Sequence, residues 1–218
     1  MARRTHALAQ QTRRRIVDAA ALVFCRQGLS RSTLEDVARQ AGVTRGAVYW
    51  HFSGKQALLN ELLHESRLPL ENLEEGSSLA EDCDRLAQAL LATVRSSDTR
   101  RIVQILLQKT EWGSAQPHVR HRVMTSRKCV CDHLTKVLRR AMTSGELGGT
   151  YSDAELEQRV RAIQAGMTGL VFELLWTPNL KDQEAHVCTV MRLLFSMLRD
   201  AATGGDDAPG LAGSLEPE

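Results

Sequence analysis

The chain has 218 residues, of which 43% are hydrophobic and 25% charged, and these are ordinary values for a globular protein. This length allows one large or two small domains with a real core. No apolar run reaches transmembrane length, and the arginine-rich start lacks the apolar centre of a signal peptide. The five cysteines have no framework spacing, which favours reduced thiols. We therefore expect a cytoplasmic protein with no membrane partner.

The charge is distributed unevenly along the chain. Residues 1–55 contain ten Lys or Arg and three acidic residues, so they carry a net +7, whereas the remainder carries −5. A basic segment on an acidic body suits a polyanionic partner. The segment lacks an apolar face rich in Trp, Phe and Leu, which disfavours a membrane-surface helix. Because the body is acidic, a structural protein that coats DNA non-specifically is also disfavoured.

The first elements in chain order are a flexible basic arm over residues 1–8 and a helix from Gln10 to Gln27. The arm is expected to contribute modest electrostatic attraction to DNA, and its simplest alternative is a solvated tail. Gly28 ends the helix. Its buried stripe is predicted to consist of Ile16, Ala20, Val23 and Phe24.

Two short helices joined by a tight turn are predicted next, from Thr33 onward. The Thr33 hydroxyl suits an N-cap, and Asp36 stands where a capping box has its acidic partner. Gly42 accepts a positive φ cheaply and ends the first of these helices. Thr44 caps the second helix, over residues 45–51. The apolar face of the first helix is formed by Leu34, Val37, Ala38 and Ala41.

The outward face of the second helix decides between two interpretations. Arg45 and Tyr49 lie four residues apart and point away from Val48 and Phe52, which face the core. Arginine binds a guanine edge in the major groove, while hydroxyl groups and lysine donate to phosphates. The alternative is an ordinary helical hairpin with a solvated polar face.

Two motifs carry a family resemblance. The run GVTRGAVYWHFSGK at residues 42–55 and the run RIVDAAALVFCRQG at residues 15–28 resemble the TetR family of bacterial transcriptional repressors. The resemblance implies that the second helix enters the major groove. A helix N-terminus also favours a phosphate at residues 32–33. The residues expected to contact DNA are Ser32, Thr33, Thr44, Arg45, Gly46, Ala47, Tyr49, Trp50, His51 and Lys55.

The rest of the chain is predicted to be helical, which gives an all-α fold of about nine helices. The domains expected are a helix-turn-helix domain over residues 1–54, a helical effector-binding and dimerisation domain over 55–203, and a disordered tail over 204–218. Pro69 suggests a kink or an early end in the fourth helix. After the helix over residues 45–51, further helices are expected over residues 55–73, 79–95, 99–112, 119–144, 153–176 and 182–202.

The run RRIVQILLQKTEW at residues 100–112 resembles the AcrR-type branch, which represses multidrug efflux operons. The resemblance implies an effector pocket for a small hydrophobic drug or biocide. Met and aromatic side chains adapt to varied apolar ligands, and buried amides need partners. For each pocket residue the alternative is an ordinary core position. The pocket residues expected are Leu91, Val94, Gln104, Gln108, Trp112, Met167 and Phe172.

Long apolar stripes on the last two helices predict a homodimer. Gly166 and Gly169 permit close helix approach, and a symmetric four-helix interface would bury the surplus apolar surface. A dimer also places two recognition helices against a palindromic operator. The interface residues expected are Ile163, Gly166, Leu170, Leu174, Val190 and Leu194.

Enzymatic function is not expected, because the sequence contains no phosphate loop, dinucleotide loop, nucleophile elbow or zinc-protease motif. Cys129 and His133 share a helical face, but the paired cysteine spacings of structural zinc are absent, so no metal or cofactor is expected. The function predicted is a ligand-released repressor of a multidrug efflux operon, relevant to antibiotic resistance. The alternative is a TetR-type regulator of another metabolic operon that responds to a small metabolite.

Overall fold

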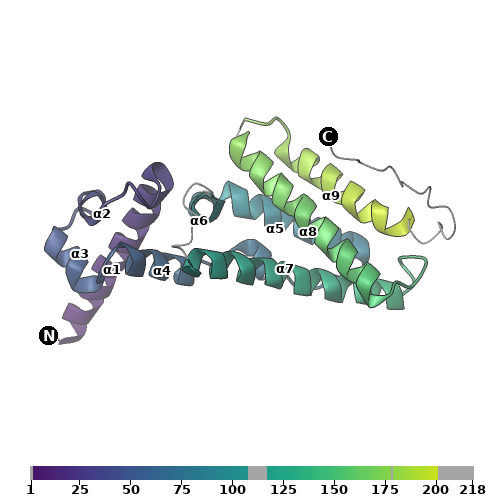
Figure 1. Ribbon diagram of the computed structural model, residues 1–218, viewed down its shortest axis with the longest axis horizontal. Coiled ribbons are helices and arrows are strands. Elements are labelled where there is room, and N and C mark those ends of the chain that lie inside the picture. Colours follow the sequence, from purple (N-terminus) through teal and green to yellow (C-terminus); the bar gives the residue numbers. More distant parts are fainter. Residues whose placement is uncertain (1, 108–116, 178, 201–218) are drawn as a thin grey trace, which may run out of the picture.

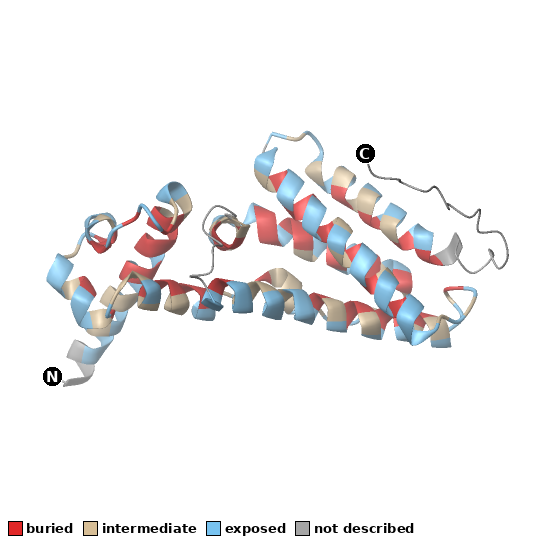
Figure 2. Cartoon of the chain, viewed as in Figure 1, coloured by how far each residue is buried: buried red, intermediate tan, exposed pale blue. Residues whose placement is uncertain are grey.

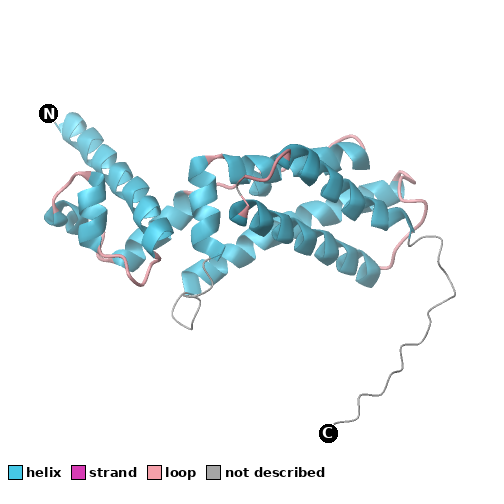
Figure 3. Cartoon of the chain, turned by 90° about the horizontal axis from the view of Figure 1, so that it is seen from above, coloured by secondary structure: helices cyan, strands magenta, loops and turns pink. Residues whose placement is uncertain are grey.

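The computed structural model describes residues 2–107, 117–177 and 179–200, and within these ranges every regular element is helical, as Figures 1 and 3 show. The all-α prediction is confirmed. The elements are α1 (Ala2–Gln27), α2 (Leu34–Ala41), α3 (Arg45–His51), α4 (Lys55–Glu65), the 3₁₀ helix η1 (Pro69–Glu71), α5 (Leu79–Arg95), α6 (Ser97–Leu107), α7 (Pro117–Thr143), α8 (Asp153–Trp176) and α9 (Gln183–Asp200). None of these helices is long and apolar enough to cross a membrane.

The molecule has two parts, which Figure 1 separates clearly. Helices α1 to α3 form a small unit, which we call the head, and α5 to α9 form a larger bundle, which we call the body. Helix α4 leads from the head toward the start of α7. The predicted tail, residues 204–218, lies outside the described residues.

Two predicted helix limits are wrong. Helix α1 begins at Ala2 and not at Gln10, so most of the predicted flexible arm is helical. This stretch is rich in Ala, Arg and Gln, which are strong helix formers. Helix α4 ends at Glu65 and not at residue 73, because Pro69 cannot donate a helical hydrogen bond and instead starts η1.

The head has a compact apolar core, coloured as buried in Figure 2. Ile16, Phe24, Val37 and Val48 are each 0% exposed, so the stripes of α1, α2 and α3 converge. Phe52, which follows α3, is 5% exposed. Burial of a side chain of this size contributes about 1.5–3 kcal/mol. The core therefore fixes the face that α3 turns to solvent.

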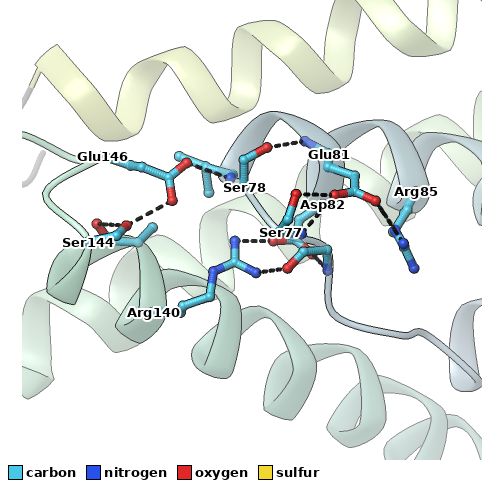
Figure 4. Close-up of polar contacts among 11 residues, drawn as sticks. Ser77, Ser78, Glu81, Asp82, Arg85, Arg140, Ser144 and Glu146 are labelled. Carbon is cyan, nitrogen blue, oxygen red and sulfur yellow. Dashed lines mark hydrogen bonds and ion pairs between the residues drawn. The ribbon is translucent and has the colours of Figure 1, made fainter.

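In the body, α8 and α9 lie against each other and against α5, with α7 along the other side (Figure 1). A Cβ on Gly166 would lie 2.6 Å from Leu194 Cδ1, so a larger residue there would require the Leu194 side chain to move. Asp82 of α5 is fully buried and pairs with Arg140 of α7 at 2.5 Å (Figure 4). The charged pair joins the start of α5 to α7.

Candidate nucleic-acid interface

Local capping sets the limits of the two head helices. The Thr33 hydroxyl accepts the Asp36 backbone N–H at 3.1 Å, and the Thr33 N–H donates to the Asp36 carboxylate at 3.1 Å. This is the predicted capping box. Gly42 has φ of 64°, where a side chain would be strained, and it ends α2. The Thr44 hydroxyl accepts the Ala47 N–H at 3.1 Å and starts α3.

Arginines of α1 hold α2 and α3 in place, and sequence reasoning missed this role. Arg15 donates to the Ala41 carbonyl at 2.7 Å and thereby satisfies the end of α2. The Arg13 guanidinium carbon lies 5.1 Å from the centre of the Phe52 ring, and Arg13 pairs with Glu61 of α4 at 2.5 Å. The run of three arginines at residues 13–15 is the feature of the sequence that corresponds to these contacts.

Helix α3 presents a row of exposed polar and aromatic side chains. Thr44, Arg45 and Tyr49 are exposed as predicted, and the Trp50 side chain is 74% exposed. Arg45 Nη2 donates to the Tyr49 hydroxyl at 3.3 Å, and its guanidinium carbon lies 5.4 Å from the Tyr49 ring centre. This hydrogen bond to Tyr49 raises the pKa of Arg45.

His51 differs from its exposed neighbours. It is half-buried, and its ring lies 4.5 Å from the Trp50 ring in an edge-to-face arrangement. Burial, assisted by the charge of Arg13, lowers the pKa of His51 below its usual 6.5. The lowered pKa favours the neutral imidazole, which has one N–H donor and one nitrogen acceptor.

The proposed phosphate contacts at Ser32 and Lys55 need correction. Ser32 is 3% exposed, and its hydroxyl donates to the Leu29 carbonyl at 2.8 Å. Lys55 Nζ donates to the carbonyls of Ser30 at 3.1 Å and Ser32 at 3.0 Å, and also to that of Leu29. These three bonds use all three ammonium donors. Lys55 therefore braces the loop between α1 and α2.

Thr33 remains exposed, but the anion position at the start of α2 is already filled. The Asp36 carboxylate accepts the Thr33 hydroxyl at 2.6 Å, and these hydrogen bonds lower the pKa of Asp36. The N-terminus of α2 thus has an internal anion.

The two remaining predicted contacts are small residues on α3. Gly46 is exposed and open, since a Cβ there would meet only the Thr44 hydroxyl, at 3.9 Å. Ala47 is half-buried. Small residues beside Arg45 leave room for the helix to approach a surface closely. The exposed row of α3 is thus suited to the edges of bases in a major groove.

The structure separates the residues predicted to bind an effector. Leu91, Val94 and Met167 are at most 3% exposed inside the body. Gln104 instead faces the head, where it accepts a hydrogen bond from the Cys25 thiol at 3.1 Å. Phe172 is 41% exposed and does not line the interior. Gln108 and Trp112 lie outside the described residues.

The residues predicted to form a dimer interface are mostly internal. Ile163, Leu170 and Leu174 are at most 3% exposed and face the core of their own chain, so they cannot form an outer surface. Gly166 serves the contact with Leu194, and Val190 and Leu194 are half-buried against the same core. Other large apolar side chains of α8 and α9 are exposed, namely Phe172 and Trp176 on α8 and Leu193 and Met197 on α9.

Comparison with known proteins agrees with this geometry. Residues 16–62 match the family described as "Bacterial regulatory proteins, tetR family". The transcriptional regulator SrpR of Pseudomonas putida is 35% identical over 202 residues, which cover 92% of this chain and 91% of SrpR. The regulator AcrR of Shigella flexneri is 32% identical over 93% of this chain and 99% of its own.

A solved structure extends the similarity to three dimensions. NalD, the secondary repressor of the MexAB-OprM multidrug efflux pump in Pseudomonas aeruginosa, superposes with a TM-score of 0.68 at 30% identity. The match covers 86% of this chain and 96% of NalD. The family match covers the head, and the similar regulators extend over nearly the whole chain. The chain therefore belongs to the tetR family of bacterial regulatory proteins.

Proposed function

We propose that this protein is a homodimeric repressor of a multidrug efflux operon, acting in the cytoplasm, and that a hydrophobic drug-like effector releases it from a palindromic operator. The observation that carries the proposal is the geometry of the capped helix α3. Its Val48 side chain is buried in the head, and this leaves Arg45, Tyr49 and Trp50 exposed on the outside. The similarity to NalD, a repressor of an efflux pump, favours an efflux operon over another operon.

The DNA contact is assigned to α3. The charged Arg45 would leave Tyr49 and bind a base edge, while Thr44 and Tyr49 donate to phosphates. The net charge of +7 on residues 1–55 would draw the head to DNA and make binding salt-dependent. Lys55 takes part indirectly, by holding the loop in front of α2.

The effector contact is assigned to the interior of the body. Leu91 and Val94 of α5 and Met167 of α8 are buried apolar side chains on neighbouring helices, which suits a mostly apolar ligand. Gln108 and Trp112 also remain in the proposed set of effector contacts. Gln104 and Phe172 are removed from it.

The dimer is assigned to the exposed apolar face of α8 and α9. Phe172 and Trp176 lie one helical turn apart, with ring centres 5.7 Å apart, and Leu193 is 60% and Met197 67% exposed. Apolar side chains of this size that gather on one face are typical of a protein–protein contact. A two-fold axis through this face would pair two copies of the chain.

The test is a selection of duplexes from a random pool, followed by titration of the selected duplex and a scrambled duplex at several salt concentrations. The proposal predicts that the selected sequence is palindromic, and that affinity for the scrambled duplex is lower at every salt concentration. If both duplexes bind equally, the protein coats DNA without sequence preference and the proposal is wrong.

A further inference from the structure

A single arginine connects the end of α4 to the body. Arg122 lies near the start of α7 with 13% of its side chain exposed, and its partner Glu71 in η1 is 11% exposed. Arg122 Nη2 lies 2.8 Å from Glu71 Oε2, and Nη1 donates to Oε1. Two parallel bonds of this kind give a strong and geometrically specific pair.

The same guanidinium also binds the last turn of α4. Arg122 Nε donates to the Leu63 carbonyl at 3.2 Å, and Nη2 donates to the Ser66 carbonyl at 3.2 Å. Carbonyls at a helix C-terminus have no partner in their own helix, and a positive charge is favourable there. Arg122 therefore fixes α4, η1 and α7 at one point.

Helix α4 also packs against the head, mainly against α1. Arg13 of α1 pairs with Glu61 at 2.5 Å and with Glu65 at 3.1 Å, and both carboxylates belong to α4. Leu58 and Leu62 of α4 are buried. Head and body also meet directly, where α1 packs against α6 and the Cys25 thiol donates to Gln104. Helix α4 provides the second connection, through Arg13 to the head and through Arg122 to η1 and α7.

We propose that Arg122 is a positioning residue that fixes the angle between head and body and thereby the spacing of the two recognition helices in the dimer. The inference rests on the proposed function as a dimeric repressor. A palindromic operator needs both heads at one spacing, whereas a half-site needs only one head. An effector that moves α7 would change that spacing through the contacts of Arg122 with α4 and η1.

The variant Arg122→Met removes the guanidinium and leaves α3 untouched. We expect its affinity for the selected palindrome to fall about tenfold, which is part of the roughly 10²–10⁴-fold gain that bivalent binding provides. Its affinity for a half-site duplex, measured at low salt, should equal that of the wild type. A residue that only supports folding would lower both affinities together.

Two further variants keep the test sharp. Arg139→Met is the control, because Arg139 lies on the same helix and pairs with Asp153 at 2.7 Å in an exposed position. It should leave both affinities unchanged. Glu71→Gln keeps the contacts of Arg122 with the Leu63 and Ser66 carbonyls, so it should fold and show a smaller loss for the palindrome alone.

The experiment combines fluorescence anisotropy on both duplexes with hydrogen exchange of the amides in residues 63–68. The expected result is faster exchange and a selective loss of palindrome binding in Arg122→Met. Unchanged palindrome affinity, or an equal loss for half-site and palindrome, overturns the inference. If the wild-type protein selects no palindrome, the repressor function itself is wrong, and unchanged exchange would show separately that Arg122 does not fix α4.

Discussion

At the scale of single residues, the proposed base recognition depends on Arg45. We expect Arg45→Ala to weaken binding to the selected duplex by about 1–3 kcal/mol and to relax the preference at one base position, because one base-edge contact is lost. Anisotropy titrations and a repeated selection measure both effects. Arg85→Ala is the control, since Arg85 is exposed on α5 in the body. An unchanged sequence preference in Arg45→Ala would show that α3 does not read the bases.

Lys55 is expected to act on stability and not on DNA contact. Lys55→Met leaves the carbonyls of Leu29, Ser30 and Ser32 without their shared donor, and we expect a loss of about 1–3 kcal/mol in the free energy of unfolding. Urea denaturation measures this, with Lys181→Met on the surface as the control. A stable variant whose DNA binding depends less on salt, by about one unit of slope, would instead show a direct phosphate contact.

At the scale of single residues, the sequence predicts the features that depend only on neighbouring residues. The caps at Thr33 and Thr44 and the turn at Gly42 follow from residue type and spacing, and all three are confirmed. The roles of Ser32 and Lys55 depend on where the loop carbonyls lie after folding. Spacing alone does not contain that information, so both were assigned to phosphates.

The exposed face of α8 and α9 gives a prediction at the scale of elements. Trp176→Glu should yield a monomer, because a dimer would bury two unpaired charges near its symmetry axis. Sedimentation velocity measures the change. The matched control is Met124→Glu, since Met124 is 48% exposed on α7. A Trp176→Glu protein that remains a dimer would place the interface on another surface.

The start of α5 gives a prediction about pH. Hydrogen bonds from the Ser77 hydroxyl and backbone, with Arg85, lower the pKa of Glu81 from 4.5 to about 2 (Figure 4). A carboxylate with a depressed pKa in the folded state stabilises fully above its unfolded pKa, and this contribution disappears as the pH falls through the folded pKa. Glu81→Gln should therefore be less stable than the wild type at pH 7. Thermal melts should show the difference shrinking below pH 4.5 and vanishing near pH 2. A stability difference between wild type and Glu81→Gln that is the same at pH 7 and near pH 2 would contradict this account.

The elements themselves were largely predictable, because their apolar stripes repeat at helical spacing. The limits of α5 and α8 match their predicted ranges. Several residues predicted to form the dimer interface are internal because α8 carries two stripes. The stripe with Leu170 and Leu174 meets its own core, while Phe172 and Trp176 lie on the other side. Periodicity predicts that a face is buried but not whether the partner is the same chain or a second copy.

At the scale of the whole molecule, the DNA-binding head meets the body at two places, where α1 packs against α6 and where α4 packs against α7. Effector binding can release DNA only through a difference in affinity between two states of the protein. By linkage, operator and effector must weaken each other by the same factor. The proposed role of Arg122 connects the movement of α7 to the position of the head. This role could not be predicted from the sequence, because it depends on where α4, η1 and α7 meet in the folded chain.

The central claim is that an effector in the body and an operator on the head weaken each other's binding. The most direct measurement is calorimetric titration of hydrophobic antibiotics and biocides into the protein, with and without the selected palindrome. The account predicts that at least one compound binds, and that the operator weakens it about 5–150-fold, with an equal effect of the compound on the operator. A compound that binds tightly and with the same affinity in both titrations would contradict the account.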